Sequence, residues 1–155
     1  MDKSNLDHTS QKILRELQQN SRLSLNELSE KVGMSASPCW RRQKELEENG
    51  YIKRYAAILE RRKVNLGLCC ILHVSLSRHE AGVVAQFEEQ MKICPAVMEC
   101  YEVTGTSDYI VKLVVPDMDG YHDLLHNVLL KLPGVSQINT SVALREVKYE
   151  TALPI

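Results

Sequence analysis

The sequence predicts an α+β protein, with an N-terminal helix-turn-helix of the winged kind followed by a C-terminal ferredoxin-like βαββαβ domain. Three stretches in the first 50 residues carry apolar side chains at helical spacing, each bounded by capping or helix-breaking residues. Residues 66–155 repeat one strand-helix-strand pattern at an offset of 38, so that Gly82 matches Gly120 and Pro95 matches Pro133. We therefore divide the chain into domains at 1–50 and 66–155, joined by a linker strand and hinge at 51–65.

The first two helices are marked by their apolar stripes and their ends. The first stripe has a period of 3.6 residues and consists of Leu6, Ser10, Ile13, Leu14 and Leu17. The second helix opens with a capping box from Ser24 to Glu27, in which hydroxyl and carboxylate each accept a backbone N–H. Gly33 ends it, since glycine adopts the positive φ of a tight turn at little cost.

The third helix is basic and follows the second after a short turn. Ser37 is a good N-cap and Pro38 is tolerated at the first helical position, so we expect the helix to run from there through Glu48 and to stop at Asn49-Gly50. Small Ser29 lets the helices approach closely, which completes a helix-turn-helix spacing. Trp40 is expected to pack on the first helix.

This arrangement indicates DNA binding, with a three-helix bundle bearing a solvated charged face as the alternative. Residues 1–62 contain 12 Lys/Arg and 9 Asp/Glu, a net of +3, and the rest contain 7 and 11, a net of −4. A basic front and an acidic back fit a DNA-binding head on a body that does not bind DNA. The candidate contacts to phosphates and guanine edges are Ser35, Ser37, Pro38, Arg41, Arg42 and Lys44.

The rest of the sequence predicts a linker followed by a domain built from a duplicated unit. Residues 51–59 are rich in strand formers and 60–63 form a charged hinge; strands follow at 69–77, 97–104, 109–115 and 135–147. Two helices lie between them. Their expected inward residues are Val83, Val84, Phe87 and Met91, then Met118, Tyr121, Leu125, Val128, Leu129 and Leu132. Right-handed crossovers put both helices on one sheet face. The other face, with Ile71, His73, Tyr101 and Val103, suggests dimerisation through stacked sheets.

These residues carry a family resemblance over essentially the whole chain. The segments ELSEKVGMSASPCWRRQKELEENGYIKRYAAIL, VTGTSDYIVKLVVPDM and ALREVKYETALPI resemble the Lrp/AsnC, or feast/famine, transcriptional regulators. The S-P-C-W segment resembles that of the cysteine-responsive branch. The resemblance implies homodimers assembling to tetramers or octamers on pseudo-palindromic double-stranded DNA. It also implies an amino-acid effector bound at a subunit interface, by Tyr101, Thr104, Gly105, Thr106, Ser107, Asp108, Met118, Thr140, Ser141 and Val142.

Other chemistry is not indicated by the sequence. No nucleophile elbow, phosphate-cradling loop or H-E-x-x-H pattern occurs, so we expect a protein that is not an enzyme and has no cofactor or metal. His122 and His126 are four residues apart on one helix, a spacing that would suit a metal pair, but we expect this helix face to be polar and solvated. Five cysteines without a C-x-x-C pair, no bilayer-length apolar run and no signal peptide predict a soluble cytoplasmic protein with free thiols. Two alternatives remain open: an architectural DNA-wrapping protein without effector, and a thiol or metal sensor.

Overall fold

The computed structural model describes residues 6–77 and 81–155, which form two compact units. One unit comprises the chain up to Ile58 together with Lys148–Ile155, and the other comprises Leu59–Val147. The last eight residues, which the sequence-based division assigned to the C-terminal domain, therefore pack with the N-terminal one.

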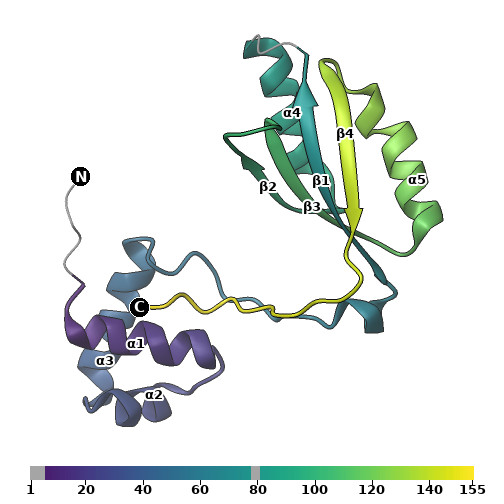
Figure 1. Cartoon of the computed structure of the whole chain (residues 1–155). Coiled ribbons are helices and arrows are strands. Elements are labelled where there is room, and N and C mark those ends of the chain that lie inside the picture. The colour runs from purple at the N-terminus through teal and green to yellow at the C-terminus, as the bar shows by residue number, and fades with distance from the viewer. Residues whose placement is uncertain (1–5, 78–80) are drawn as a thin grey trace. The chain divides into compact units, whose positions relative to one another are not determined.

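Three helices build the first unit: α1 (His8–Gln19), α2 (Leu25–Val32) and α3 (Ala36–Glu48) (Figure 1). Their apolar stripes meet in a closed core made of Ile13, Leu14, Leu17, Leu28, Val32, Cys39 and Leu46. The predicted capping box is present, with the Ser24 hydroxyl accepting from the Glu27 amide and the Glu27 carboxylate accepting from the Ser24 amide. Gly33 follows α2 with a φ of 73°, in the left-handed region. The predicted helix-turn-helix is confirmed.

Two local predictions for this unit are wrong. Helix α3 begins at Ala36 with Ser35 as N-cap, two residues earlier than expected, so Pro38 is the third helical residue. That position costs nothing, because the first four N–H groups of a helix lack an intrahelical partner anyway. Residues 51–59 form no strand: Lys53 to Glu60 are exposed and no described segment pairs with them. Strand-forming side chains alone do not make a strand without a neighbouring strand to bond.

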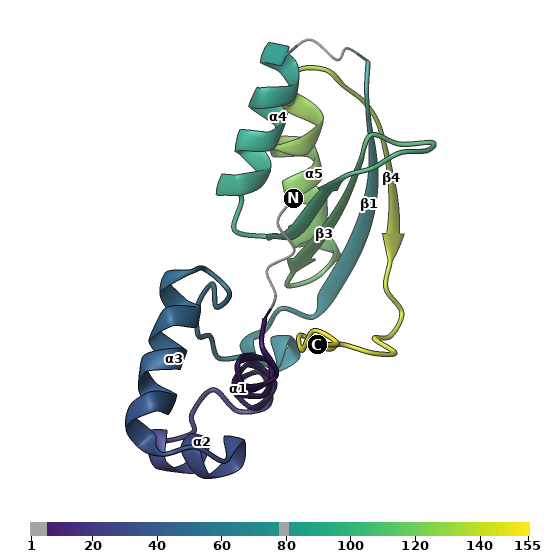
Figure 2. The ribbon, with the colours of Figure 1, turned by 90° about the vertical axis from the view of Figure 1, so that its left-hand side faces the viewer.

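The second unit is a four-stranded antiparallel sheet. The strands are β1 (Leu68–Leu76), β2 (Val97–Glu102), β3 (Tyr109–Val115) and β4 (Val135–Val142), in the order β2-β3-β1-β4. Helices α4 (Ala81–Ile93) and α5 (Met118–Asn127) connect β1 to β2 and β3 to β4. Both helices lie on the same sheet face (Figure 2). This is the predicted ferredoxin-like fold, and the 38-residue repeat corresponds to its two βαβ halves.

The core of this unit lies between the sheet and the two helices. Alternate β1 residues Cys70, Leu72, Val74 and Leu76 point into it and meet Phe87 and Met91 of α4 and Tyr121 of α5. Met118, predicted to face inward, is 53% exposed because it opens α5 at the end of the helix. The last strand is shorter than predicted: β4 leaves the sheet after Val142, opposite Cys70, near the point where β1 itself begins.

Two short 3-10 helices complete the described elements. η1 (Arg61–Val64) lies in the predicted charged hinge. η2 (Leu129–Lys131) follows α5 in the chain and precedes β4. Asn65 then closes η1 with a φ of 60°. The helix-free sheet face carries the half-buried Ile71 and His73 and the exposed Tyr101.

The C-terminal tail, Lys148–Ile155, docks on α1. Gln18 exchanges two hydrogen bonds with Leu153: the Leu153 amide donates to Gln18 Oε1 at 2.6 Å, and Gln18 Nε2 donates to the Leu153 carbonyl at 3.2 Å. Arg15 donates to the carbonyl of Ile155. An amide side chain thus pairs with extended backbone as a neighbouring strand would, which places the tail in the first unit.

Candidate functional site

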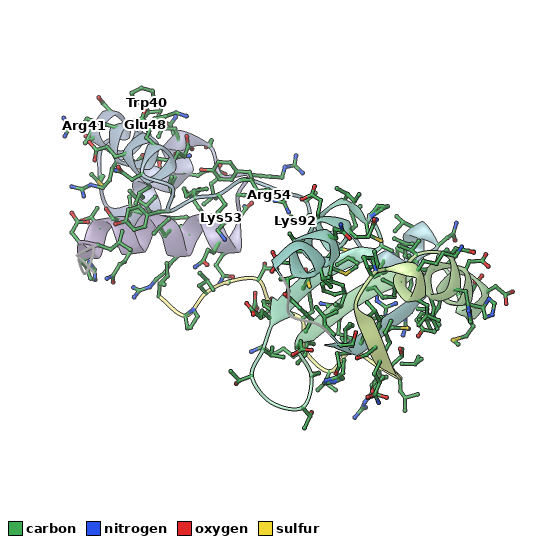
Figure 3. The ribbon with its side chains drawn as sticks, turned by 90° about the horizontal axis from the view of Figure 1, so that it is seen from above. Trp40, Arg41, Glu48, Lys53, Arg54 and Lys92 are labelled. Atoms are coloured by element: carbon green, nitrogen blue, oxygen red, sulfur yellow. The ribbon has the colours of Figure 1, made fainter. Side chains whose placement is uncertain are left out.

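The outer side of α3 presents an exposed stripe of polar and aromatic side chains. Ser37, Trp40, Arg41, Lys44 and Glu48 fall within one face of a 3.6-residue helix and all are exposed. Trp40 and Arg41 extend away from α1 (Figure 3). The prediction that Trp40 packs on α1 is wrong: its side chain is 53% exposed. Its position three residues after Ser37 and four before Lys44 is compatible with this stripe, but nothing in the sequence marks which side of the helix α1 covers.

The two cationic side chains of the stripe, Arg41 and Lys44, form only weak ion pairs within α3. Arg41 lies 3.9 Å from Glu45 and Lys44 lies 2.6 Å from Glu47, both as ion pairs between exposed or half-exposed side chains. Exposed ion pairs of this kind are weak and screened by salt. Arg41 and Lys44 can therefore exchange these carboxylates for phosphate or base-edge acceptors.

Arg42 is placed differently from its neighbour. It faces α1, where it forms an ion pair with Asp7 and donates to the hydroxyl of the buried Ser10 at 3.1 Å. Asp7 is also the N-cap of α1, and the Ser10 amide, the Ser10 hydroxyl and Arg42 together lower the pKa of its carboxyl. Arg42 thus fixes α3 against the start of α1. One residue along a helix is a rotation of about 100°, which separates Arg41 from Arg42.

The remaining residues predicted to contact DNA lie at the start of α3. Ser35 and Ser37 are exposed, and Pro38 is half-buried. The Ser35 side chain makes no capping hydrogen bond. The first-turn amides, whose partners would otherwise be water, lie beside these hydroxyls and favour an anion.

A side-chain cluster that the sequence reading missed ties the chain beyond α3 back to the helix. The Tyr55 hydroxyl donates to Glu47 at 2.9 Å and accepts from Gln43 at 3.0 Å. Burial raises the pKa of Tyr55. The positions Gln43 and Glu47, one helical turn apart, are compatible with such a cluster, but nothing in the sequence marks Tyr55 as their partner.

In the second unit, the loop from Thr104 to Asp108 joins β2 to β3. Gly105 has a φ of 126°, and a Cβ added there meets no atom within 4 Å, so glycine serves the backbone conformation and leaves the loop surface open. Thr104, Gly105 and Thr106 are exposed. The Ser107 hydroxyl lies 3.5 Å from Nδ1 of His73.

Asp108 anchors this loop to β1. Its Oδ2 accepts the Leu76 amide at 2.7 Å, and its own amide donates to the Val74 carbonyl at 2.9 Å. Its carbonyl accepts from Val103 across the loop. The carboxylate therefore has a structural role in fixing the loop, and contact with an ammonium group would add to that role.

Within one protomer the other predicted effector-site residues lie apart from this loop. Thr140 and Val142 point to the helix-covered face, where the Tyr121 hydroxyl is 2.6 Å from Thr140 Oγ1. Ser141 points to the opposite face, like Tyr101. Val142 lies opposite Cys70, six β1 residues from Leu76, or roughly 20 Å along the strand. Met118 is at that same distant end, after β3. One chain does not gather the ten residues into a single pocket.

Three of the five cysteine thiols are held in the protonated form by burial. All five cysteines are free. Burial raises the pKa of Cys39, Cys70 and Cys100, which keeps these thiols protonated at neutral pH. The His122 and His126 rings lie 4.4 Å apart, but no group of three or more potential metal ligands occurs among residues 6–77 and 81–155. In the same ranges no helix is long and apolar enough to cross a membrane.

A helix-turn-helix with an exposed basic recognition stripe, joined to a separate ferredoxin-like unit, defines a two-domain transcriptional regulator. Residues 6–53 match the model of a winged helix-turn-helix DNA-binding domain, and residues 69–153 match the Lrp/AsnC ligand-binding domain. The chain belongs to the Lrp/AsnC family. Its expected family, fold and role in transcription regulation are thereby confirmed.

Named relatives and solved structures agree with this assignment. The chain is 38% identical to the Bkd operon transcriptional regulator of Pseudomonas aeruginosa, covering 97% of this chain and 98% of the relative. It is 39% identical to the leucine-responsive regulatory protein of Escherichia coli, covering 97% and 92%. A transcriptional regulator of Neisseria meningitidis, crystallised in complex with L-methionine, superposes with a TM-score of 0.92 at 40% identity, covering 96% of each chain.

Proposed function

We propose that this protein binds pseudo-palindromic operators as a homodimer or a larger assembly of dimers, and that an amino acid modulates its assembly or DNA binding. The observation that carries the DNA-binding half is the exposed α3 stripe of Ser37, Trp40, Arg41 and Lys44. A recognition helix of this kind enters the major groove, and a dimer presents two such helices about one helical turn apart. Such a regulator acts in the cytoplasm.

Within the stripe we assign different roles to adjacent arginines. Arg41, with its side chain 75% exposed, reaches phosphates or guanine edges, whereas Arg42 positions α3 on α1. Ser35, Ser37 and Pro38 bring the first turn of α3 close to a phosphate. Lys44 contributes a further phosphate contact, and Trp40 contributes apolar contact beside it.

Quantitative DNA binding tests this division of roles. Operator fragments selected from a random duplex pool are titrated against the wild type, Arg41→Ala and the matched variant Arg42→Ala at several salt concentrations. We expect Arg41→Ala to lose about tenfold or more in affinity with a melting temperature near that of the wild type. Arg42→Ala should lower the melting temperature of the first unit. Arg41→Ala with unchanged operator affinity would remove Arg41 from the interface.

The effector proposal rests on the open loop Thr104–Asp108 in a matched ligand-binding domain. Gly105 allows close backbone approach, loop N–H groups suit a carboxylate, and Asp108 suits an ammonium group. Since Met118, Thr140, Ser141 and Val142 lie toward the other end of the sheet, we propose that the complete pocket combines the loop of one protomer with such residues of another. The open sheet face with Ile71 and His73 is the proposed dimer contact.

A thermal-shift screen of the full chain against the twenty L-amino acids tests the effector proposal, with L-methionine, L-leucine and L-cysteine as the first probes. A ligand that binds only the folded state raises its melting temperature. We expect a hit that Thr106→Arg abolishes, because the new side chain fills the exposed loop. The control Glu146→Arg, also exposed, should retain it. No shift at millimolar concentrations would reject an amino-acid effector, and equal footprints on random DNA would then favour a DNA-wrapping role.

A further inference from the structure

A groove separate from the loop Thr104–Asp108 lies between α4 and the edge strand β2. Its volume is about 380 Å³, within the range of small-molecule sites. Met91 of α4 and Met98 of β2 contribute apolar surface to its lining, which also includes Cys100 and Tyr109. Methionine side chains are flexible and polarizable, so they adapt to ligands of varied shape. This groove is on the helix-covered side of the sheet.

The charge of the groove selects a cation. Its described lining includes the carboxylates of Glu88, Glu99 and Glu102 and one ammonium, that of Lys92. Glu99 is already paired with Lys112, its cross-strand neighbour on β3, at 2.8 Å. Glu88 accepts a hydrogen bond from the Tyr109 hydroxyl at 3.1 Å, which fixes one carboxylate oxygen and leaves the second available. Glu102, opposite Tyr109 in the sheet, adds a second carboxylate at the same end.

The other titratable groups of the lining, the Tyr109 hydroxyl and the Cys100 thiol, are neutral. Burial, and then the hydrogen bond to Glu88, raise the pKa of Tyr109 to about 12, and burial raises the pKa of Cys100. Both groups therefore stay protonated at pH 7 and add no charge. Perturbed titratable groups gathered in a concave site are characteristic of binding sites.

We propose that this groove binds a small organic cation, a primary amine on a short apolar body. The ammonium sits between the carboxylates of Glu88 and Glu102, and the body packs on Met91 and Met98. An amino-acid effector is a poor occupant, because its α-carboxylate would meet these same carboxylates. The groove adjoins the start of the β2–β3 loop at Glu102, so its occupant can influence that loop.

Hexylammonium chloride is the probe, titrated into the full-length ¹⁵N-labelled protein and followed by amide shifts. At about 0.6 kcal/mol per non-hydrogen atom, a ligand of this size has a dissociation constant on the order of 1 mM, so the titration extends to tens of millimolar. We expect saturable shifts confined to the α4 C-terminal half, β2 and Tyr109. Hexan-1-ol, with the same body and no charge, should bind at least tenfold more weakly. Excess L-methionine should not displace the amine, which separates this site from the proposed effector site.

Two surface variants complete the test. Glu102→Gln keeps the shape and removes the charge, and we expect at least fivefold weaker amine binding. Met98→Lys, at a position 59% exposed, places a like charge at the wall and should abolish binding while the fold is retained. Glu146→Gln, an exposed carboxylate outside the groove, is the control. Equal binding of hexan-1-ol, unchanged affinity in Glu102→Gln, or shifts outside α4, β2 and Tyr109 would overturn the proposal.

Discussion

Leu28→Ala tests whether the first unit has a stability of its own. Leu28 is 1% exposed and packs in a core with Ile13, Leu17, Val32 and Cys39. Truncating such a buried leucine costs roughly 2–5 kcal/mol, because it removes apolar contact and leaves a cavity that three short helices fill only in part. A unit of this size has a stability of only about 3–9 kcal/mol. The substitution therefore removes a large part of that stability.

The protein carries its own reporter for this measurement. Trp40 is the only tryptophan and lies on α3, so its fluorescence follows the first unit, whereas far-UV circular dichroism follows both. A loss of about 3 kcal/mol should lower the fluorescence midpoint by roughly 10–25 °C. The core of the second unit shares no residue with the core of the first unit, so the unfolding transition of the second unit should stay in place.

Leu144→Ala is the matched control, because Leu144 is 93% exposed and its truncation should move neither transition by more than about 0.5 kcal/mol. The reasoning is refuted if Leu28→Ala costs less than about 1 kcal/mol. It is equally refuted if both transitions fall together, since the two cores would then melt as one. DNA binding by Leu28→Ala at its lowered midpoint should be lost.

Three further predictions concern the tail, the second unit and pH. Gln18→Ala removes both hydrogen bonds to Leu153. We expect faster amide hydrogen exchange from residue 148 onward and a fall of the first unit's melting temperature by only a few degrees. Unchanged amide exchange in the tail would disprove its docking on α1. Tyr109 has a folded-state pKa of about 12, above its ordinary value near 10, so its contribution to stability is present below pH 10 and is lost as pH rises from about 10 to 12. In urea denaturation between pH 10 and 12, the free energy of unfolding of Tyr109→Phe should therefore fall less steeply with pH than that of the wild type. Tyr121→Phe leaves the Thr140 hydroxyl without its 2.6 Å partner and should cost about 1 kcal/mol in the second unit, measured by urea denaturation, with no effect on operator affinity in the absence of effector.

Local signals in the chain were sufficient where one short segment decides the outcome. The capping box at Ser24, the turn at Gly33 and the end of α3 at Asn49-Gly50 each depend on residues within one helical turn, and the structure has them as predicted. The ferredoxin-like topology was also predictable, because the 38-residue repeat encodes two βαβ halves and crossover handedness restricts how they pack.

Long-range pairing decided the rest. Residues 51–59 have strand-forming side chains but find no partner strand. Strand β4 ends at Val142, opposite Cys70, and the Ala143 amide makes one further hydrogen bond to the Cys69 carbonyl before the chain leaves the sheet. The role of Arg42 depends on Asp7, 35 residues earlier, and nothing near Arg42 in the sequence announces it.

The sequence by itself determined the helices, most of the strands, the capping box of α2, the fold class and the family. Only the tertiary structure decided that Trp40 faces outward, that Arg42 turns to α1, and that the tail joins the first unit through Gln18, 135 residues away from Leu153. The physical reason is common to all three. Periodicity and capping are energies of neighbouring residues, whereas the choice among exposed faces and distant partners depends on which surfaces meet once the elements have formed.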